Sequence, residues 1–262
     1  MGASYNIMGQ VFMSRAVPTL LVVTAVICAG CGQPDTAVVE TRRPAATAAN
    51  AAPSAGTPSA RALSLPRIVF LGDSLTAGYG LAKEESVPSL IASRLRSDGY
   101  DYEVVNAGVS GDTSAGGLSR LDWSLEGDVR VLVVELGGND GLRGLPVESL
   151  KQNLTEIITR AKRRGIKVVL TGMEAPPNFG ASYTAEFRRV YRDLAKDHDV
   201  TFVPFYLEGV AGNPALNIAD GIHPNAEGSR IVERSIWRAV EPLLEKNPAA
   251  STSLGAGRSG TR

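Results

Sequence analysis

The chain has 262 residues, of which 44% are hydrophobic and 21% charged, and its 27 Lys and Arg are balanced by 27 Asp and Glu. This length suits one or two domains, and the balanced charge favours neither a nucleic-acid partner nor a strongly anionic surface. Composition therefore excludes several classes of protein and selects none.

Residues 1–31 have the pattern of a signal peptide. The apolar run at 16–30, "AVPTLLVVTAVICAG", follows Arg15 and is shorter than the roughly 20 residues that a membrane-spanning helix needs. We therefore expect the protein to be exported and to be periplasmic, membrane-tethered or secreted.

Both cysteines of the chain lie at the end of this segment, in "CAGC" at 28–31. This motif resembles a bacterial lipobox, which implies lipidation of Cys31 and a lipid anchor, although Cys28 stands where that pattern usually has leucine. Ordinary signal cleavage near Ala29, with both cysteines inert, is the alternative. The rest of the chain has no cysteine, which excludes disulfides, a cysteine nucleophile and cysteine-ligated metal there.

Two further segments have little that could form a core. Residues 32–64 are rich in Ala, Pro and Thr and are predicted to be a disordered linker, and residues 246–262 to be a disordered tail. Between them, residues 65–245 are long enough for one domain that buries about 70% of its unfolded surface.

Within this domain, five apolar runs are rich in β-branched residues and show no alternation with polar ones. They are predicted to be strands at 67–72, 102–107, 129–136, 167–172 and 200–205. Continuous apolar strands are typical of parallel sheets covered on both faces.

Amphipathic helical patterns separate or follow these strands. Helices are predicted at 147–164, where Gly165 ends the pattern, at 185–197 and at about 225–245. Strands alternating with helices predict right-handed crossovers and a three-layer α/β/α sandwich. In such a sheet ligands bind at the carboxyl ends of the strands.

Chemically useful residues follow the strands at that predicted edge. Ser74 lies in "GDSLTAGYG" (72–80), Gly111 in "NAGVSGDTS" (106–114) and Asn139 in "GGND" (137–140). The stretch "MEAPPN" (173–178) follows the fourth strand, and the loop after the fifth ends in "DGIHPN" (220–225).

His223 is the candidate general base, because His198 lies among charges near a predicted helix end and is interpreted as solvated. Taken alone, His223 is more simply a turn residue before Pro224. Asp220, three residues earlier, can accept a hydrogen bond from Nδ1–H and leave Nε2 free as a base. Ser74 then has both a base and an orienting acid.

An acyl-transfer site also needs donors for the developing oxyanion. The backbone N–H groups of Ser74 and Gly111 and the Nδ2 amide of Asn139 can supply them, each typically worth about 10²–10³ in rate. Individually Gly111 and Asn139 are explained as turn residues. Their joint occurrence at one sheet edge favours an oxyanion hole.

The four motifs "GDSLTAGYG", "NAGVSGDTS", "ELGGND" and "DGIHPN" resemble, in order and spacing, the sequence blocks of the SGNH (GDSL) hydrolases. The likeness is strongest to the bacterial periplasmic thioesterase–lysophospholipase and arylesterase subgroup. It implies a flavodoxin-like five-stranded sheet of order 2-1-3-4-5, a Ser74–Asp220–His223 triad, oxyanion donors from Ser74, Gly111 and Asn139, and neither metal nor cofactor.

This resemblance predicts a serine ester hydrolase acting on small-molecule acyl esters or thioesters. The balanced charge predicts no nucleic-acid partner, and the protein is expected to be a monomer. Residues Leu142, Arg143, Pro176, Pro177 and Phe179 are predicted to wall the acyl site, and Asp73 to order its loop rather than to take part in the chemistry. A carbohydrate O-deacetylase of the same superfamily and a non-catalytic acyl-binding lipoprotein are the alternatives.

Overall fold

The computed structural model describes residues 65–246. The predicted signal peptide (1–31) with Cys31, the predicted linker (32–64) and the tail beyond Lys246 lie outside the described residues. Among residues 65–246, no helix is long and apolar enough to cross a lipid bilayer.

Within residues 65–246, a parallel sheet of five strands forms the middle layer, in the order β2-β1-β3-β4-β5. The strands are β1 (Arg67–Gly72), β2 (Glu103–Gly108), β3 (Val129–Glu135), β4 (Lys167–Thr171) and β5 (Thr201–Val203). The strand order and the parallel direction of the strands confirm the predicted sheet. The fifth strand is shorter than the expected 200–205, because Pro204 has no N–H to extend the ladder.

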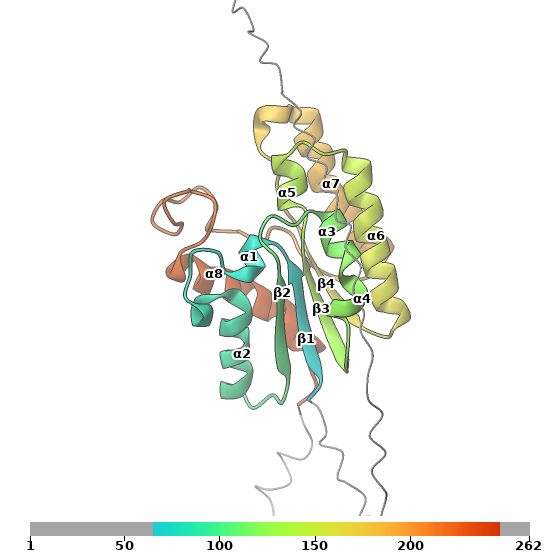
Figure 1. Cartoon of the computed structure of the whole chain (residues 1–262), viewed down its shortest axis with the longest axis vertical. Coiled ribbons are helices and arrows are strands. Elements are labelled where there is room, and N and C mark those ends of the chain that lie inside the picture. The colour runs from blue at the N-terminus through green and yellow to red at the C-terminus, as the bar shows by residue number, and fades with distance from the viewer. Residues whose placement is uncertain (1–64, 247–262) are drawn as a thin grey trace, which may run out of the picture. The chain divides into compact units, whose positions relative to one another are not determined.

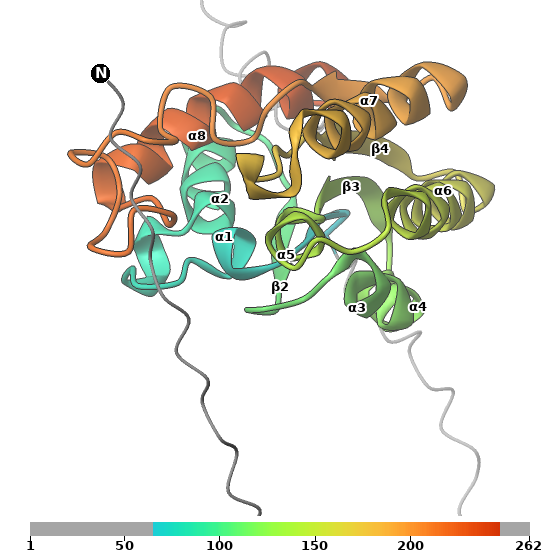
Figure 2. The ribbon, with the colours of Figure 1, turned by 90° about the horizontal axis from the view of Figure 1, so that it is seen from above.

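Helices cover both faces of this sheet (Figures 1 and 2). One face carries α2 (Val87–Ser97) and α8 (Ala226–Val240), which contact each other. The other carries α3 (Ser114–Ser119), α4 (Leu121–Ser124), α6 (Val147–Arg163) and α7 (Ala181–Asp197). Two short helices, α1 (Ser74–Ala77) and α5 (Gly138–Leu142), begin directly after β1 and β3, and single 3-10 turns are η1 (Lys83–Glu85), η2 (Pro177–Phe179) and η3 (Glu241–Leu243).

The helix boundaries follow local signals in the sequence. Asn225 caps α8, its Oδ1 accepting the N–H groups of Glu227 and Gly228 at 3.0 Å each, and Gly165 follows α6 with a φ of 74°. The expected helix at 185–197 starts four residues earlier, at Ala181. The expected helix at about 225–245 is α-helical only to Val240 and continues as the 3-10 turn η3.

Helix α2 was not predicted, although its start carries a recognisable signal. Ser86 is its N-cap, with Oγ accepting the N–H of Ser89 at 3.4 Å, and Pro88 lies in the first turn, where its missing N–H costs nothing. Its apolar positions are fewer than those of α6, and for this reason the periodicity alone is a weak signal.

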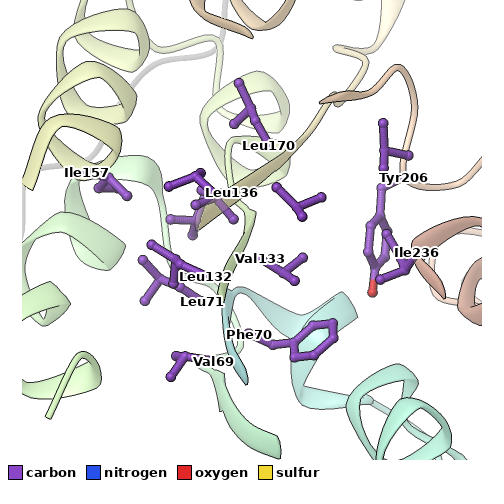
Figure 3. Packing of buried hydrophobic residues seen from close by; sticks show 14 of the residues in the cluster. Val69, Phe70, Leu71, Leu132, Val133, Leu136, Ile157, Leu170, Tyr206 and Ile236 are labelled. Carbon is purple, nitrogen blue, oxygen red and sulfur yellow. The ribbon is translucent and has the colours of Figure 1, made fainter. Parts of the chain in front are cut away.

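The core lies on both sides of the sheet. Figure 3 shows Phe70 and Val133 on the side of Tyr206 and Ile236, whereas Leu71 and Leu132 lie on the side of Ile157 of α6. This is the burial pattern that continuous apolar strands predict. Packing on both faces holds the strands in one register, which in turn positions the loops at their carboxyl ends.

Candidate active site

Three predicted residues from distant segments meet at the carboxyl edge of the sheet. Ser74 is the first residue of α1, directly after β1, and His223 lies in the loop that precedes α8. The Oγ of Ser74 is 2.8 Å from Nε2 of His223, and Nδ1 of His223 is 2.6 Å from Oδ2 of Asp220. The structure therefore brings hydroxyl, imidazole and carboxylate into one hydrogen-bonded line.

The acid and the imidazole are held by their own loop. Oδ1 of Asp220 accepts the backbone N–H groups of His223 and Ile222 at 3.0 and 2.9 Å. These two hydrogen bonds, that of His223 first, lower the pKa of Asp220 to about 2. The carboxylate is thus charged at neutral pH and faces Nδ1, an arrangement that leaves Nε2 to accept the Ser74 proton.

Gly111, the second predicted oxyanion donor, lies in a tight turn after β2. The N–H of Asp112 donates to the carbonyl of Val109 at 3.1 Å, and Gly111 has a φ of 86°, which side chains rarely adopt. The guanidinium of Arg143 donates to the carbonyl of Gly111 at 2.9 Å. This contact joins the turn after β2 to the end of α5.

Asn139, the third predicted donor, is oriented by Asp73. Its Nδ2 donates to Oδ2 of Asp73 at 3.0 Å, so the carboxamide presents nitrogen rather than oxygen on that side. An amide nitrogen carries two hydrogens, and the second stays available for a ligand. Oδ1 of Asp73 accepts the N–H of Leu75 at 3.0 Å and thereby caps α1, which agrees with the structural role expected of Asp73.

Three further residues near the site were missed by the sequence reasoning. Arg120 donates to the carbonyls of Ala107 (2.6 Å) and Gly72 (2.8 Å) and pairs with Asp112 at 2.7 Å. It therefore fastens the ends of β1 and β2 to the turn that carries Gly111. Nothing in its local sequence, "GLSRL", distinguishes it from a surface arginine.

Glu135 at the end of β3 was also missed. It is fully buried, and Oε2 accepts hydrogen bonds from the N–H of Asp73 (3.2 Å) and from Oγ1 of Thr76 (2.8 Å). An acidic residue inside the apolar run 131–136 was the available signal. Tyr79 is a third addition, since its ring centroid lies 4.8 Å from that of His223.

The predicted wall residues lie on the loops after β3 and β4. Leu142 and Phe179 are 50% and 42% exposed. A Cβ on Gly144 would lie 2.5 Å from Cε1 of Phe179, so the two loops touch there. Pro177 begins η2 and Pro176 precedes it. Contact of these residues with a substrate stays a prediction.

No group of three or more His, Cys, Asp or Glu side chains within residues 65–246 is placed to hold a metal ion. This edge of the sheet carries a hydroxyl, an imidazole, a fixed carboxylate and several N–H donors. Together these are the parts that acyl transfer to a serine requires.

Comparison with known proteins identifies the family. A model of the GDSL-like lipase/acylhydrolase family matches residues 70–231. The chain is 44% identical over 178 residues to esterase TesA of Pseudomonas aeruginosa, which covers 68% of this chain and 89% of that protein. It is 37% identical over 185 residues to thioesterase 1/protease 1/lysophospholipase L1 of Escherichia coli K12, covering 70% and 88%.

A solved structure agrees with these relatives. The psychrotrophic esterase EstA from Pseudoalteromonas sp., inhibited by monoethylphosphonate, matches with a TM-score of 0.64 at 32% identity, over 67% of this chain and 97% of that one. The fold and the predicted family are thereby confirmed. The chain belongs to the GDSL-like lipase/acylhydrolase family and is an ester hydrolase.

Proposed function

We propose that Ser74, His223 and Asp220 are the catalytic triad, and that the chain cleaves acyl esters and thioesters through a covalent acyl-enzyme. The observation that carries this proposal is the unbroken line of contacts, 2.8 Å from Ser74 Oγ to Nε2 and 2.6 Å from Nδ1 to Asp220. A binding protein without turnover has no need of this alignment.

In the first half-reaction, Nε2 of His223 takes the proton of Ser74 as Oγ attacks the acyl carbon. The carbonyl oxygen becomes an oxyanion, which the N–H groups of Ser74 and Gly111 and Nδ2 of Asn139 stabilise. As the oxyanion collapses, the C–O or C–S bond to the leaving group breaks. The imidazolium then returns its proton to the leaving alcohol or thiol.

In the second half-reaction, water attacks the acyl-enzyme, and Nε2 of His223 accepts one of its protons. Collapse of the second oxyanion breaks the bond between the acyl carbon and Oγ and releases the carboxylic acid, and the imidazolium returns its proton to Oγ of Ser74. The carboxylate of Asp220 stabilises the imidazolium in both halves, because it is already charged.

The substrate is proposed to carry an apolar acyl or aryl group. Five exposed hydrophobic side chains lie on the loops that surround Ser74 at this edge of the sheet, and their exposure runs from 42% to 54%: Tyr79, Val109, Leu142, Phe179 and Ile222. These exposed apolar side chains suit an acyl chain as the ligand. A carbohydrate deacetylase would be expected to have a polar cleft instead.

The triad is tested by the variant Ser74→Ala. Removal of Oγ eliminates the covalent step, and we expect hydrolysis of a p-nitrophenyl acyl ester to fall by about 10³-fold or more. An organophosphonate should label Ser74 in the wild-type protein and label nothing in the variant. A folded variant with wild-type turnover would contradict the proposal, and an acyl-chain-length series on the wild type reports the preferred substrate.

We also propose that the protein is exported, on the support of the apolar run 16–30 behind Arg15. Mass spectrometry of the mature N-terminus decides between a diacylated Cys31 and cleavage near Ala29. An N-terminus that retains the whole apolar run would contradict export.

A further inference from the structure

Glu135 is a buried carboxyl group that the proposed mechanism does not use, although it lies directly beneath the turn that carries Ser74. It is fully buried and pairs across the sheet with Gly72. A Cβ on Gly72 would lie 2.6 Å from Glu135 Oε2 and 2.0 Å from Oγ1 of Thr76. The glycine of the first motif therefore makes room for this carboxyl group.

The contacts of Glu135 attach it to both ends of that turn. Oε2 accepts the N–H of Asp73 at 3.2 Å and the hydroxyl of Thr76 at 2.8 Å. Ser74 lies between these two donors in the chain. The direction of its backbone N–H, a proposed oxyanion donor, is consequently set by a turn that Glu135 holds at the end of β3.

Two carboxyl groups, those of Glu135 and Asp73, are buried side by side at this point. Within residues 65–246 no cationic side chain forms an ion pair with Glu135. Two adjacent buried carboxylates cannot both be charged at low cost, so one keeps its proton. Burial raises the pKa of Asp73 as well, but Asp73 is the better anion of the two, because the N–H of Leu75 and Nδ2 of Asn139 donate to its carboxylate.

The proton therefore belongs on Glu135. Its Oε1 is buried and has no hydrogen-bond partner in the described part of the chain, which leaves it free to carry that proton. Burial, and after it the charge of Asp73, raises the pKa of Glu135 well above its usual range. The other ionisable groups that bear on this carboxyl are the hydroxyls of Tyr191 and Tyr206, whose pKa values burial also raises well above their usual range, so both stay neutral.

We propose that Glu135 is a positioning residue that acts in its neutral form, holding the 73–76 turn for catalysis while Asp73 keeps the single negative charge of the pair. The proposal rests on the proposed function, since it takes the N–H of Ser74 as an oxyanion donor. A neutral Glu135 avoids a second negative charge next to the carboxylate of Asp73, which orients Asn139.

Two variants of Glu135 distinguish the effect of its hydrogen-bond acceptor from the effect of its charge. Glu135→Gln keeps an acceptor and a donor without charge, so we expect kcat to stay within about threefold of wild type. Glu135→Leu removes the acceptor, and we expect kcat to fall by about 10- to 100-fold with KM within about threefold, less than the 10²–10³ typical for loss of a whole oxyanion donor. Glu233→Gln is the matched control, because Glu233 is also a buried glutamate but pairs with Arg94 at 3.3 Å.

The protonation state is measured without reference to activity. The infrared carbonyl band of a protonated carboxyl group should be present at pH 7 in the wild type and in Glu233→Gln, and absent in Glu135→Gln. A folded state that binds one extra proton also makes the unfolding equilibrium constant rise about tenfold per pH unit above the unfolded pKa of glutamate. That slope should be one proton smaller in Glu135→Gln.

Each outcome decides the proposal. If Glu135→Gln loses as much activity as Glu135→Leu, or if a folded Glu135→Leu keeps wild-type kcat, Glu135 is not a neutral positioning residue. Absence of the infrared band in the wild type contradicts it as well. If Glu135→Leu does not fold, Glu135→Gln and the band still decide. Failure of the proposed function would be separate, because it would appear as turnover in Ser74→Ala.

Discussion

At the scale of single residues, the site depends on groups whose state is set by backbone N–H donors. Asp220 is the clearest case, since two N–H groups of its own loop lower its pKa to about 2. Because the folded pKa lies below the usual value of 3.8, its ionisation stabilises the folded state above about pH 4, and this contribution is lost as pH falls toward 2.

The first prediction at this scale is that Asp220→Asn lowers kcat by roughly 10²–10⁴-fold. The amide can donate to Nδ1 and so favour the tautomer that carries its proton on Nε2, which cannot accept the Ser74 proton. Steady-state kinetics measures the loss, and Asp220→Glu is the control that keeps the charge but displaces it. A folded Asp220→Asn variant with turnover near wild type would remove Asp220 from the triad.

A second prediction concerns pH. Asp220 remains ionised down to about pH 2, so the acid limb of kcat/KM above pH 4 should not report its protonation. A kcat/KM profile in which one proton accounts for the acid limb agrees with this. A second ionisation between pH 4 and 5 that disappears in Asp220→Asn would show that the carboxyl is less acidic than its contacts imply.

At the scale of elements, the loops of the proposed active site are anchored by a helix start or by an arginine side chain. Helix α8 begins three residues after His223, and Asn225 caps it while its Nδ2 donates to the carbonyl of Ala215 at 2.8 Å. Arg120 joins the ends of β1 and β2, because its guanidinium donates to the carbonyls of Gly72 and Ala107. The positions of the loops are thus properties of the elements that flank them.

The prediction at this scale is that Asn225→Ala destabilises the protein by about 1 kcal/mol, with a range of 0.5–2, through loss of the cap. Asn225→Asp keeps the cap acceptor but loses the bond to Ala215, and should cost less. Chemical denaturation at constant m-value measures both. Equal losses in the two variants would mean that the bond to Ala215, and not the cap, carries the stability.

At the scale of the whole molecule, stability depends on a sheet that is buried on both faces. Leu132 is 0% exposed and lies on the side of α6, whereas Trp123 on α4 is 69% exposed. Burial of apolar surface is the dominant favourable term in folding. The same packing keeps the strands in the register that brings Ser74 to His223 across 149 positions of the chain.

We expect Leu132→Ala to lower the free energy of unfolding by about 2–5 kcal/mol, because the sheet cannot close the cavity. Trp123→Ala is the control and should stay within about 0.5 kcal/mol of wild type. Urea titrations of both compare the effects directly. Similar values for the two variants would contradict the two-sided core.

Much of this architecture was predictable from local patterns. The five strands, their parallel direction and the residues at the carboxyl edge follow from apolar runs, helical periodicity and the rule that parallel strands end at one edge, whereas the strand order was implied by the family resemblance. The apolar pattern of α2 is too weak to predict a helix, and β5 is shorter than its apolar run because Pro204 cannot donate to the ladder. Local signals existed for both.

The sequence by itself determined the fold class, the family resemblance and the candidate triad, because each depends on short motifs and on chain order. The tertiary structure alone decided the acidic pair beneath Ser74, the clamp of Arg120 and the contact between Arg143 and Gly111. These contacts join segments that lie 32 to 62 positions apart. Strand register and burial bring such segments together, and neither the register nor the burial can be predicted from a local sequence pattern.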